Sequence, residues 1–243
     1  MTQRSTFKSA EYWKENLSYL AKSVRQYEKM ARDDKGDPEL RERGRRMAWS
    51  RQLDLIRAHY SAGSPIAKLP PLYAELVEHI SDYLDDPARL TFELSDIDHY
   101  VRVISMLALG ILLRANDKQL APVLEFAGKP GQDAFFDQLA ARPPAGKRAM
   151  PPKLAHPKPF ALLERALVAK DSNAAADALI EFLQKYYAGI KNTYFYNTHL
   201  KGDAGFVGYW SFEAALVAVV KDIDDSAIAD NPYYPADLVA YAR

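Results

Sequence analysis

The chain contains no cysteine, which excludes disulfide bonds, thiolate metal sites and cysteine nucleophiles. It also has no net charge, because 32 Lys and Arg balance 32 Asp and Glu, so no overall positive field attracts nucleic acid. The longest uncharged apolar run, Val103 to Leu113, has eleven residues, whereas a helix needs about 20 to cross a bilayer. The first residues lack the apolar core of a secretory signal. We therefore expect a soluble intracellular protein without a membrane partner or a direct nucleic-acid partner.

Sequence signatures of catalysis are missing as well. There is no phosphate-binding loop, no dinucleotide-binding glycine pattern, no hydrolase nucleophile elbow and no His-Glu-x-x-His motif. Glu75, His79 and Asp82 lie at helical spacing on one face, but metal centres in helical proteins draw ligands from several helices. An exposed polar face is the better interpretation of these three residues. We predict no catalytic residue, no metal site and no cofactor.

The chain is rich in apolar residues at helical spacing. Its 243 residues, 48% of them hydrophobic, are enough for a large core in one or two domains. Apolar side chains recur every three or four residues along three stretches, which predicts helices over about 13–31, 49–60 and 72–84. Because Gly36-Asp37-Pro38 leaves only a short gap, the first two should be antiparallel neighbours. A helix capped at Ser95 or Asp96 is apolar almost all round and should be central.

The second half of the chain predicts shorter helices over 117–126, 133–141, 160–169 and 174–187, and a final one from Asp237. Six prolines within 143–159 predict an exposed connector without regular helix. No stretch alternates convincingly with a period of two, so strands should be few or absent. The predicted fold is all-α, a multi-helix bundle of antiparallel helical hairpins. We expect an amino-terminal domain over 1–128 and a carboxyl-terminal domain over 129–243, packed as one unit.

Nine aromatic side chains lie within residues 186–212. Such a cluster is either a stacking platform for bases or sugars or a seam of the core whose hydroxyl groups hold the loop backbone. Only Lys191 and Lys201 interleave with the rings, which argues against nucleic acid and favours the core. Glu213 follows directly, with no carboxylate or His partner near in sequence. We expect it to be a hydrogen-bond anchor for tyrosine hydroxyls or backbone N–H groups of 186–209, not a general acid.

Three separated blocks of the carboxyl-terminal half occur in the order found in a known family. They are GYWSFEAA from Gly208, Asp-Asp-Ser at 224–226 and NPYYPADLV at 231–239. With Lys158-Pro-Phe and the YFYNTH stretch at 194–199, they resemble the carboxyl-terminal domain of the PoNe immunity protein (PoNi) family over about residues 156–241. The amino-terminal half is similar to the family's other domain only in helical layout. The blocks chiefly build structure, through Tyr209, Trp210, Glu213, Tyr233, Tyr234 and Asp237.

The resemblance implies a cytoplasmic, all-α immunity protein that neutralises a cognate polymorphic toxin. In the family that toxin is typically a DNase of the PD-(D/E)xK type, delivered by a contact-dependent or type VI secretion system. Family members are inhibitors rather than enzymes. Two other classes stay open from the residues alone: a helical adaptor for another peptide partner, and an enzyme that uses an aromatic pocket with Glu213, His199 and Asp203.

Charge is uneven along the chain although the total is zero. Residues 71–115 carry eight acidic and three basic side chains, and residues 171–243 carry ten and five. Because a DNase holds a polyanion, an inhibitor that covers its active site should present carboxylates. The exposed-looking candidates for toxin contact are Asp222, Asp224, Asp225 and Asp230 in one cluster and Asp82, Asp85 and Asp86 in the other.

Overall fold

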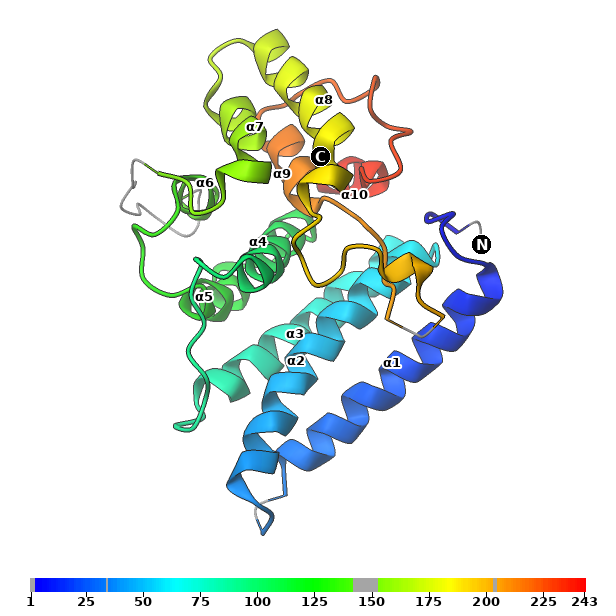
Figure 1. Ribbon diagram of the computed structural model, residues 1–243, viewed down its shortest axis with the longest axis vertical. Helices are drawn as coiled ribbons and strands as arrows, with labels where there is room; N and C mark the ends of the chain where they lie inside the picture. Colours follow the sequence, from blue (N-terminus) through cyan, green and yellow to red (C-terminus); the bar gives the residue numbers. More distant parts are fainter. Residues whose placement is uncertain (1–2, 34, 142–152, 203–204) are drawn as a thin grey trace. The chain divides into compact units, whose positions relative to one another are not determined.

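The computed structural model describes residues 3–33, 35–141, 153–202 and 205–243. Within these residues the fold is all-α, with ten α-helices, two short 3₁₀ segments and no strand, as the sequence predicts (Figure 1). The chain forms two compact units. The first comprises Met1–Thr91 and Asn197–Gly208, and the second comprises Phe92–Tyr196 and Tyr209–Arg243. The predicted boundary after residue 128 stays a prediction.

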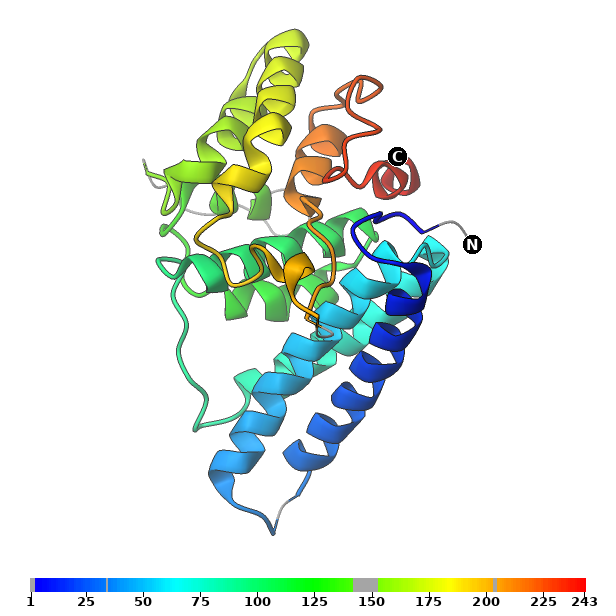
Figure 2. The ribbon, with the colours of Figure 1, turned by 45° about the vertical axis from the view of Figure 1, so that its right-hand side comes forward.

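The first unit is built on three long helices: α1 (Ala10–Ala31), α2 (Pro38–Ser61) and α3 (Leu69–Leu84), the last preceded by the 3₁₀ segment η1 (Ile66–Lys68). Figures 1 and 2 show these helices side by side, with α1 and α2 as the expected antiparallel hairpin. Ser9 caps α1 through the Tyr12 N–H, and Asp37 caps α2 ahead of Pro38. Side-chain acceptors at these positions satisfy N–H groups that a helix start leaves without partners.

A segment from far along the chain completes the first unit. The described residues of this segment contain the 3₁₀ segment η2 (Thr198–Leu200), and Phe206 and Val207 contact α1 and α2. The Tyr12 hydroxyl and the Asn16 side-chain amide both donate to the Phe206 carbonyl, at 2.8 and 2.9 Å. The Ser61 hydroxyl donates to the Val207 carbonyl at 2.8 Å. Because these donors satisfy buried carbonyls, they hold the returning segment in the core.

The second unit contains the other seven helices: α4 (Ile97–Leu112), α5 (Asp117–Phe126), α6 (Ala134–Ala140), α7 (Pro157–Val168), α8 (Ser172–Gly189), α9 (Phe212–Val220) and α10 (Ala236–Ala242). Helix α4 is buried along nearly its whole length, as expected for a central helix. Its cap is Asp96, whose carboxylate accepts from the Asp98 N–H at 2.8 Å. Helices α7 and α8 form a second hairpin, side by side in both views (Figures 1 and 2).

Part of the proline-rich segment that was predicted to be connector is helical. Helix α7 begins at Pro157, inside the stretch predicted to be connector, although Lys158 has non-helical backbone angles (φ −95°, ψ 106°). Proline is tolerated in a first helical turn because its missing N–H has no partner there. Residues 143–152 of the predicted connector lie outside the described residues.

A buried carboxylate organises the start of α6. Asp133 is fully buried, and its oxygens accept hydrogen bonds from the Phe136 N–H at 2.6 Å, the Ala155 N–H at 2.7 Å and the Tyr100 hydroxyl at 3.0 Å. Burial, and then the neighbouring Asp133 charge, raise the pKa of Tyr100 well above its ordinary value. One side chain therefore joins α4, α6 and the segment that leads to α7.

The imidazole of His99 gives the second unit a pH dependence. It is buried between Phe92 and Phe126, with ring centroids 5.1 and 5.0 Å away. Burial lowers the pKa of His99 to about 4, with Arg102 acting in the same sense and Asp96 against it. Between pH 6.5 and 4, His99 is therefore protonated in the unfolded chain but neutral in the folded chain. The free energy of unfolding falls as the pH drops through this window.

We expect acidification from pH 7 to pH 4 to cost as much as about 3 kcal/mol through this residue. Urea unfolding at both pH values measures the loss. A His99→Phe variant should lose less than the wild type, because its ring does not titrate. Equal losses in the two proteins would contradict the assignment to His99.

Candidate functional site

Aromatic residues of the second unit pack against one another, and some of them are core residues. Tyr209 and Trp210 are 1% and 8% exposed. The Tyr187 ring stacks on Tyr233 with centroids 5.8 Å apart and meets Tyr209 edge-on at 5.0 Å. Burial, and then the hydrogen bond with Tyr209, raise the pKa of Tyr187. Tyr209 and Trp210 are therefore core residues, whereas Tyr187 and Tyr233 are half-buried. The contacts among these rings serve packing.

Glu213 lies in the first turn of α9 and is 4% exposed. Its Oε1 accepts a hydrogen bond from the Ser211 hydroxyl at 2.8 Å. This partner is not among the tyrosine hydroxyls and backbone N–H groups of 186–209 expected from the sequence. Ser211 in turn caps α9, and its N–H donates to the Tyr233 carbonyl at 2.9 Å. The glutamate is thus part of the anchor between the start of α9 and the Tyr233-Tyr234 turn.

The three residues of the alternative catalytic set belong to different parts of the chain. His199 belongs to the first unit, where its ring packs edge-on against Phe7 and Phe206 at 5.3 and 6.1 Å. Glu213 belongs to the second unit. The third member, Asp203, lies outside the described residues. This set carries no catalytic proposal.

Replacing Glu213 tests its structural role. Glu213→Ala should lower the free energy of unfolding by about 1–3 kcal/mol, because the buried Ser211 hydroxyl loses its acceptor. Glu213→Gln keeps an acceptor oxygen and should lose less. Thermal denaturation followed by circular dichroism measures both. An alanine variant that melts like the wild type yet no longer neutralises its partner would contradict a structural role.

Some carboxylates of the carboxyl-terminal acidic cluster are hydrogen-bonded within the chain, and others are exposed. Asp225 accepts hydrogen bonds from the Tyr234 hydroxyl and from Arg243 Nη1, both at 2.8 Å, and its side chain is 16% exposed. Asp224 accepts from the Ser226 N–H at 3.0 Å, and hydrogen bonds from Ser226 lower the pKa of Asp224. Asp222 and Asp230 are exposed. The expectation that Asp225 is exposed is therefore wrong. Its carboxylate is half-buried because it binds both Tyr234 and Arg243.

The other acidic cluster also contains one buried member. Asp86 is 4% exposed and forms a 2.5 Å ion pair with Arg45 Nη1. Burial alone would raise the pKa of Asp86, but hydrogen bonds from the Ala88 N–H and Arg45 outweigh it and hold that pKa below its ordinary value. Asp82 and Asp85 are exposed. Asp86 thus joins α2 to the end of α3, and the expectation of an exposed Asp86 is wrong.

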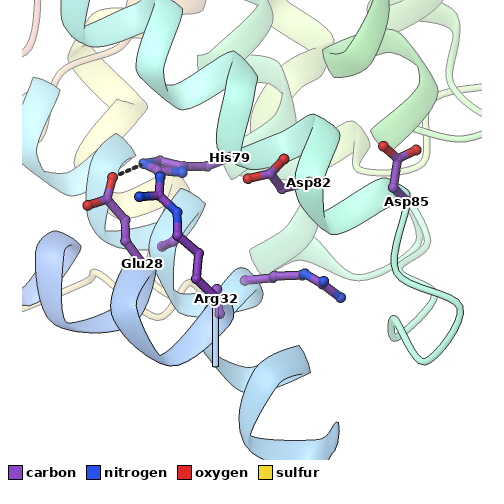
Figure 3. Close-up of a pocket in the computed structure, with 8 residues that line it drawn as sticks. Glu28, Arg32, His79, Asp82 and Asp85 are labelled. Carbon is purple, nitrogen blue, oxygen red and sulfur yellow. Dashed lines mark ion pairs between the residues drawn. The ribbon is translucent and has the colours of Figure 1, made fainter. Parts of the chain in front are cut away.

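A pocket of about 380 Å³ opens in the first unit, with walls from α1, α2 and the end of α3 (Figure 3). Its charged or titratable lining residues are Glu28, Arg32, Arg45, His79, Asp82 and Asp85. The Glu28 carboxylate and His79 Nε2 face each other across helices α1 and α3 at 3.4 Å, drawn as a dashed line in Figure 3. The sequence grouped His79 and Asp82 on one helix face but gave no sign of Glu28 and Arg32 opposite them.

The described residues contain no group of three or more His, Asp or Glu side chains placed to hold a metal ion. Glu75, a member of the weak metal pattern, instead accepts from the Gln52 amide at 2.9 Å. No described helix combines the length and the apolar character needed to cross a bilayer. The titratable groups described above anchor structure or lie on the surface of a protein in the all-α class.

Comparison with known families identifies the group within that class. The model of "PoNe immunity protein (PoNi), N-terminal" matches residues 2–124, and that of "PoNe immunity proteins (PoNi), C-terminal" matches residues 131–238. The chain belongs to the PoNi family, and the likeness covers the amino-terminal half as well as the carboxyl-terminal blocks. Membership makes it a non-enzymatic immunity protein whose partner is a cognate PoNe toxin.

A solved structure shares the fold. The crystal structure of protein PA2201 from Pseudomonas aeruginosa matches with a TM-score of 0.76 at 21% sequence identity, covering 100% of this chain and 91% of that one. Among curated proteins no match is found.

Proposed function

We propose that the protein neutralises a PoNe toxin that is a DNase of the PD-(D/E)xK type, by stoichiometric binding. The match of both halves to the PoNi family models carries the proposal. The toxin arrives through a type VI or other contact-dependent secretion system, and the encounter takes place in the cytoplasm, where the toxin finds DNA. Inhibition requires only that the bound protein covers the active site or holds it in an inactive conformation.

The surface charges support this mode of binding. A DNase attracts DNA with a basic surface, and a protein that covers such a surface gains from carboxylates in both encounter rate and orientation. Asp222, Asp224 and Asp230 in the second unit, and Asp82 and Asp85 in the first, are exposed. We assign these five as the toxin-facing carboxylates, and Asp86 and Asp225 as residues that hold the surrounding structure.

Co-expression with the cognate toxin tests the function. Bacteria that express the toxin's catalytic domain should lose chromosomal DNA, seen by nucleoid staining, and should keep it when this protein is present. A toxin that kills without degrading DNA would overturn the DNase assignment. Survival without any complex between the two purified proteins would overturn inhibition by binding.

The double variant Asp222→Asn with Asp230→Lys tests the carboxyl-terminal surface. Removing the first charge and reversing the second should slow association with the toxin about tenfold at low salt and flatten its salt dependence, since steering depends on net charge. Asparagine suits position 222, where φ is 49°. Stopped-flow association rates measure the effect.

A matched control changes charge equally at other exposed positions of the second unit, Asp177→Lys with Glu125→Gln. This control should associate with the toxin at nearly the wild-type rate. If both double variants slow association by the same factor, the effect is one of total charge and the surface assignment is wrong.

A further inference from the structure

A second pocket, of about 460 Å³, lies in the second unit at the end of the α7–α8 hairpin where α7 begins and α8 ends. Its apolar walls are formed by Pro159, Ala161 and Leu162 of α7 and by Phe182, Tyr186 and Ala188 of α8. The two helix ends are in close contact, because a Cβ at Gly189 would stand 2.6 Å from the Cβ of Pro159. Helix packing therefore fixes these walls before a partner binds.

Positive charge surrounds this apolar pocket. Three lysines, Lys158, Lys185 and Lys191, contribute to its lining, and no Asp or Glu of the described residues does. Lys185 is paired with Glu181, with its Nζ 2.6 Å from the carboxylate Oε1. Lys158 and Lys191 are exposed, and their ammonium groups form no hydrogen bond or ion pair with any residue that the structure describes. Two ammonium groups at the pocket are therefore available to an outside anion.

The charge of the surrounding chain makes this position of the lysines informative. Residues 171–243 carry ten acidic and only five basic side chains. One of the five belongs to the first unit, and Lys221 and Arg243 bind a backbone carbonyl and a carboxylate of the second. The two that remain, Lys185 and Lys191, both line the pocket. An acidic stretch of chain thus places its remaining positive charge at one apolar site, which favours an anionic partner there.

We propose that this pocket receives an apolar side chain of the toxin, from a segment whose neighbouring side chains are acidic. The inference rests on the proposed function, since it takes the cognate toxin as the partner, but it uses a face of the toxin other than the basic one that holds DNA. An apolar centre with a charged rim is the usual anatomy of an interface. Anchors that fill such pockets carry much of the binding energy, and lysines at the rim favour acidic neighbours over basic ones.

Filling the pocket tests the apolar contact. Ala161 lines the pocket and is exposed, so the indole of an Ala161→Trp variant can occupy the cavity without disturbing the core. The dissociation constant between the purified protein and the catalytic domain of its cognate toxin should rise about tenfold. The matched control is Gln184→Trp, at an exposed position of α8 outside the lining, and it should stay within about twofold of the wild type. Circular dichroism should show unchanged helix in both variants.

Removing the lysine charges tests the acidic neighbours. Lys158→Gln with Lys191→Gln should raise the dissociation constant about fivefold at low salt and less at high salt, because exposed charges are screened. The matched control is Lys118→Gln with Lys170→Gln, two exposed lysines of the second unit outside the lining, which should change affinity little. If the toxin surface opposite the pocket were basic, the pocket variant would bind more tightly than the wild type.

Alanine scanning of the toxin's Asp and Glu residues identifies the partner segment. One of them should weaken binding to the wild type and cost almost nothing further toward the Lys158/Lys191 double variant, the signature of direct coupling. The pocket assignment is overturned if the wild type binds and neutralises the toxin while either pocket variant binds as tightly, or if the lysine variant binds more tightly. A wild type that fails to bind the toxin at all overturns the proposed function instead.

Discussion

Asp133→Ala is expected to lower the free energy of unfolding by at least about 3 kcal/mol, the largest loss of any single change considered for this protein. The carboxylate is fully buried and accepts from three donors: the N–H groups of Phe136 and Ala155 and the hydroxyl of Tyr100. Truncation removes the acceptor of all three donors, two of which, the Phe136 N–H and the Tyr100 hydroxyl, are buried. Each buried unsatisfied group costs about 1–3 kcal/mol.

The matched control is Asp171→Ala, which removes the cap of α8. Asp171 is exposed, and its carboxylate accepts from the Ala174 N–H at 2.9 Å. Water can replace that partner, so the loss should be near 1 kcal/mol, the usual value for a cap. Urea unfolding of the two variants gives the comparison. Equal losses would show that the contacts of Asp133 do not act together in holding the second unit.

Gly44→Val should cost about 3 kcal/mol, the second largest effect. A Cβ at position 44 would stand 2.5 Å from the Ala31 nitrogen and 2.9 Å from the Met30 carbonyl carbon, both backbone atoms of α1. Side chains can move aside, but helix backbone cannot without separating α1 from α2 along their length. The glycine is therefore required by the close approach of two helices.

Two controls isolate this effect. Gly202→Val adds the same atoms where no atom of the described residues lies within 4 Å of the new Cβ, and should change stability little. Gly44→Ala separates packing from helix propensity, because alanine in a helix gains about 1 kcal/mol over glycine. Thermal melts should show a net loss for Gly44→Ala. A gain would mean that α1 and α2 are not in such close contact.

Helices with a clear apolar periodicity or a capping residue in their own sequence were predicted well. The apolar stripe from Trp13 is the buried face of α1, and Asn116 starts α5 through a capping box with Gln119. These signals are local, since periodicity and caps depend on residues three or four apart. The all-α fold and the helical hairpins followed from them.

Features that depend on distant residues were not predictable in this way. Residues 197–208 join the first unit because Tyr12, Asn16 and Ser61 meet carbonyls nearly 150 or more positions away. The burial of Asp86 depends on Arg45, which lies 41 positions earlier. An aspartate on one helix gives no sign of the arginine that another helix will present, so both acidic clusters looked more uniformly exposed than they are.

The charged pocket shows the same limit. His79 and Asp82 could be placed on one face from their spacing, which led only to a weak metal pattern. The opposing Glu28 and Arg32 come from α1, so the cavity exists only after the three helices pack. The family blocks of the carboxyl-terminal half, by contrast, are runs of consecutive residues, so they indicated the PoNi family from the sequence alone.

The central proposal is tested most directly by titrating the toxin's DNase activity with this protein. A fixed concentration of toxin, well above the dissociation constant, is mixed with increasing amounts of the protein, and cleavage of linear DNA is followed by fluorescence. Stoichiometric inhibition predicts a linear fall in activity that reaches zero at one equivalent. Activity that persists at several equivalents, or that disappears at a small fraction of one equivalent, would contradict neutralisation by one-to-one binding.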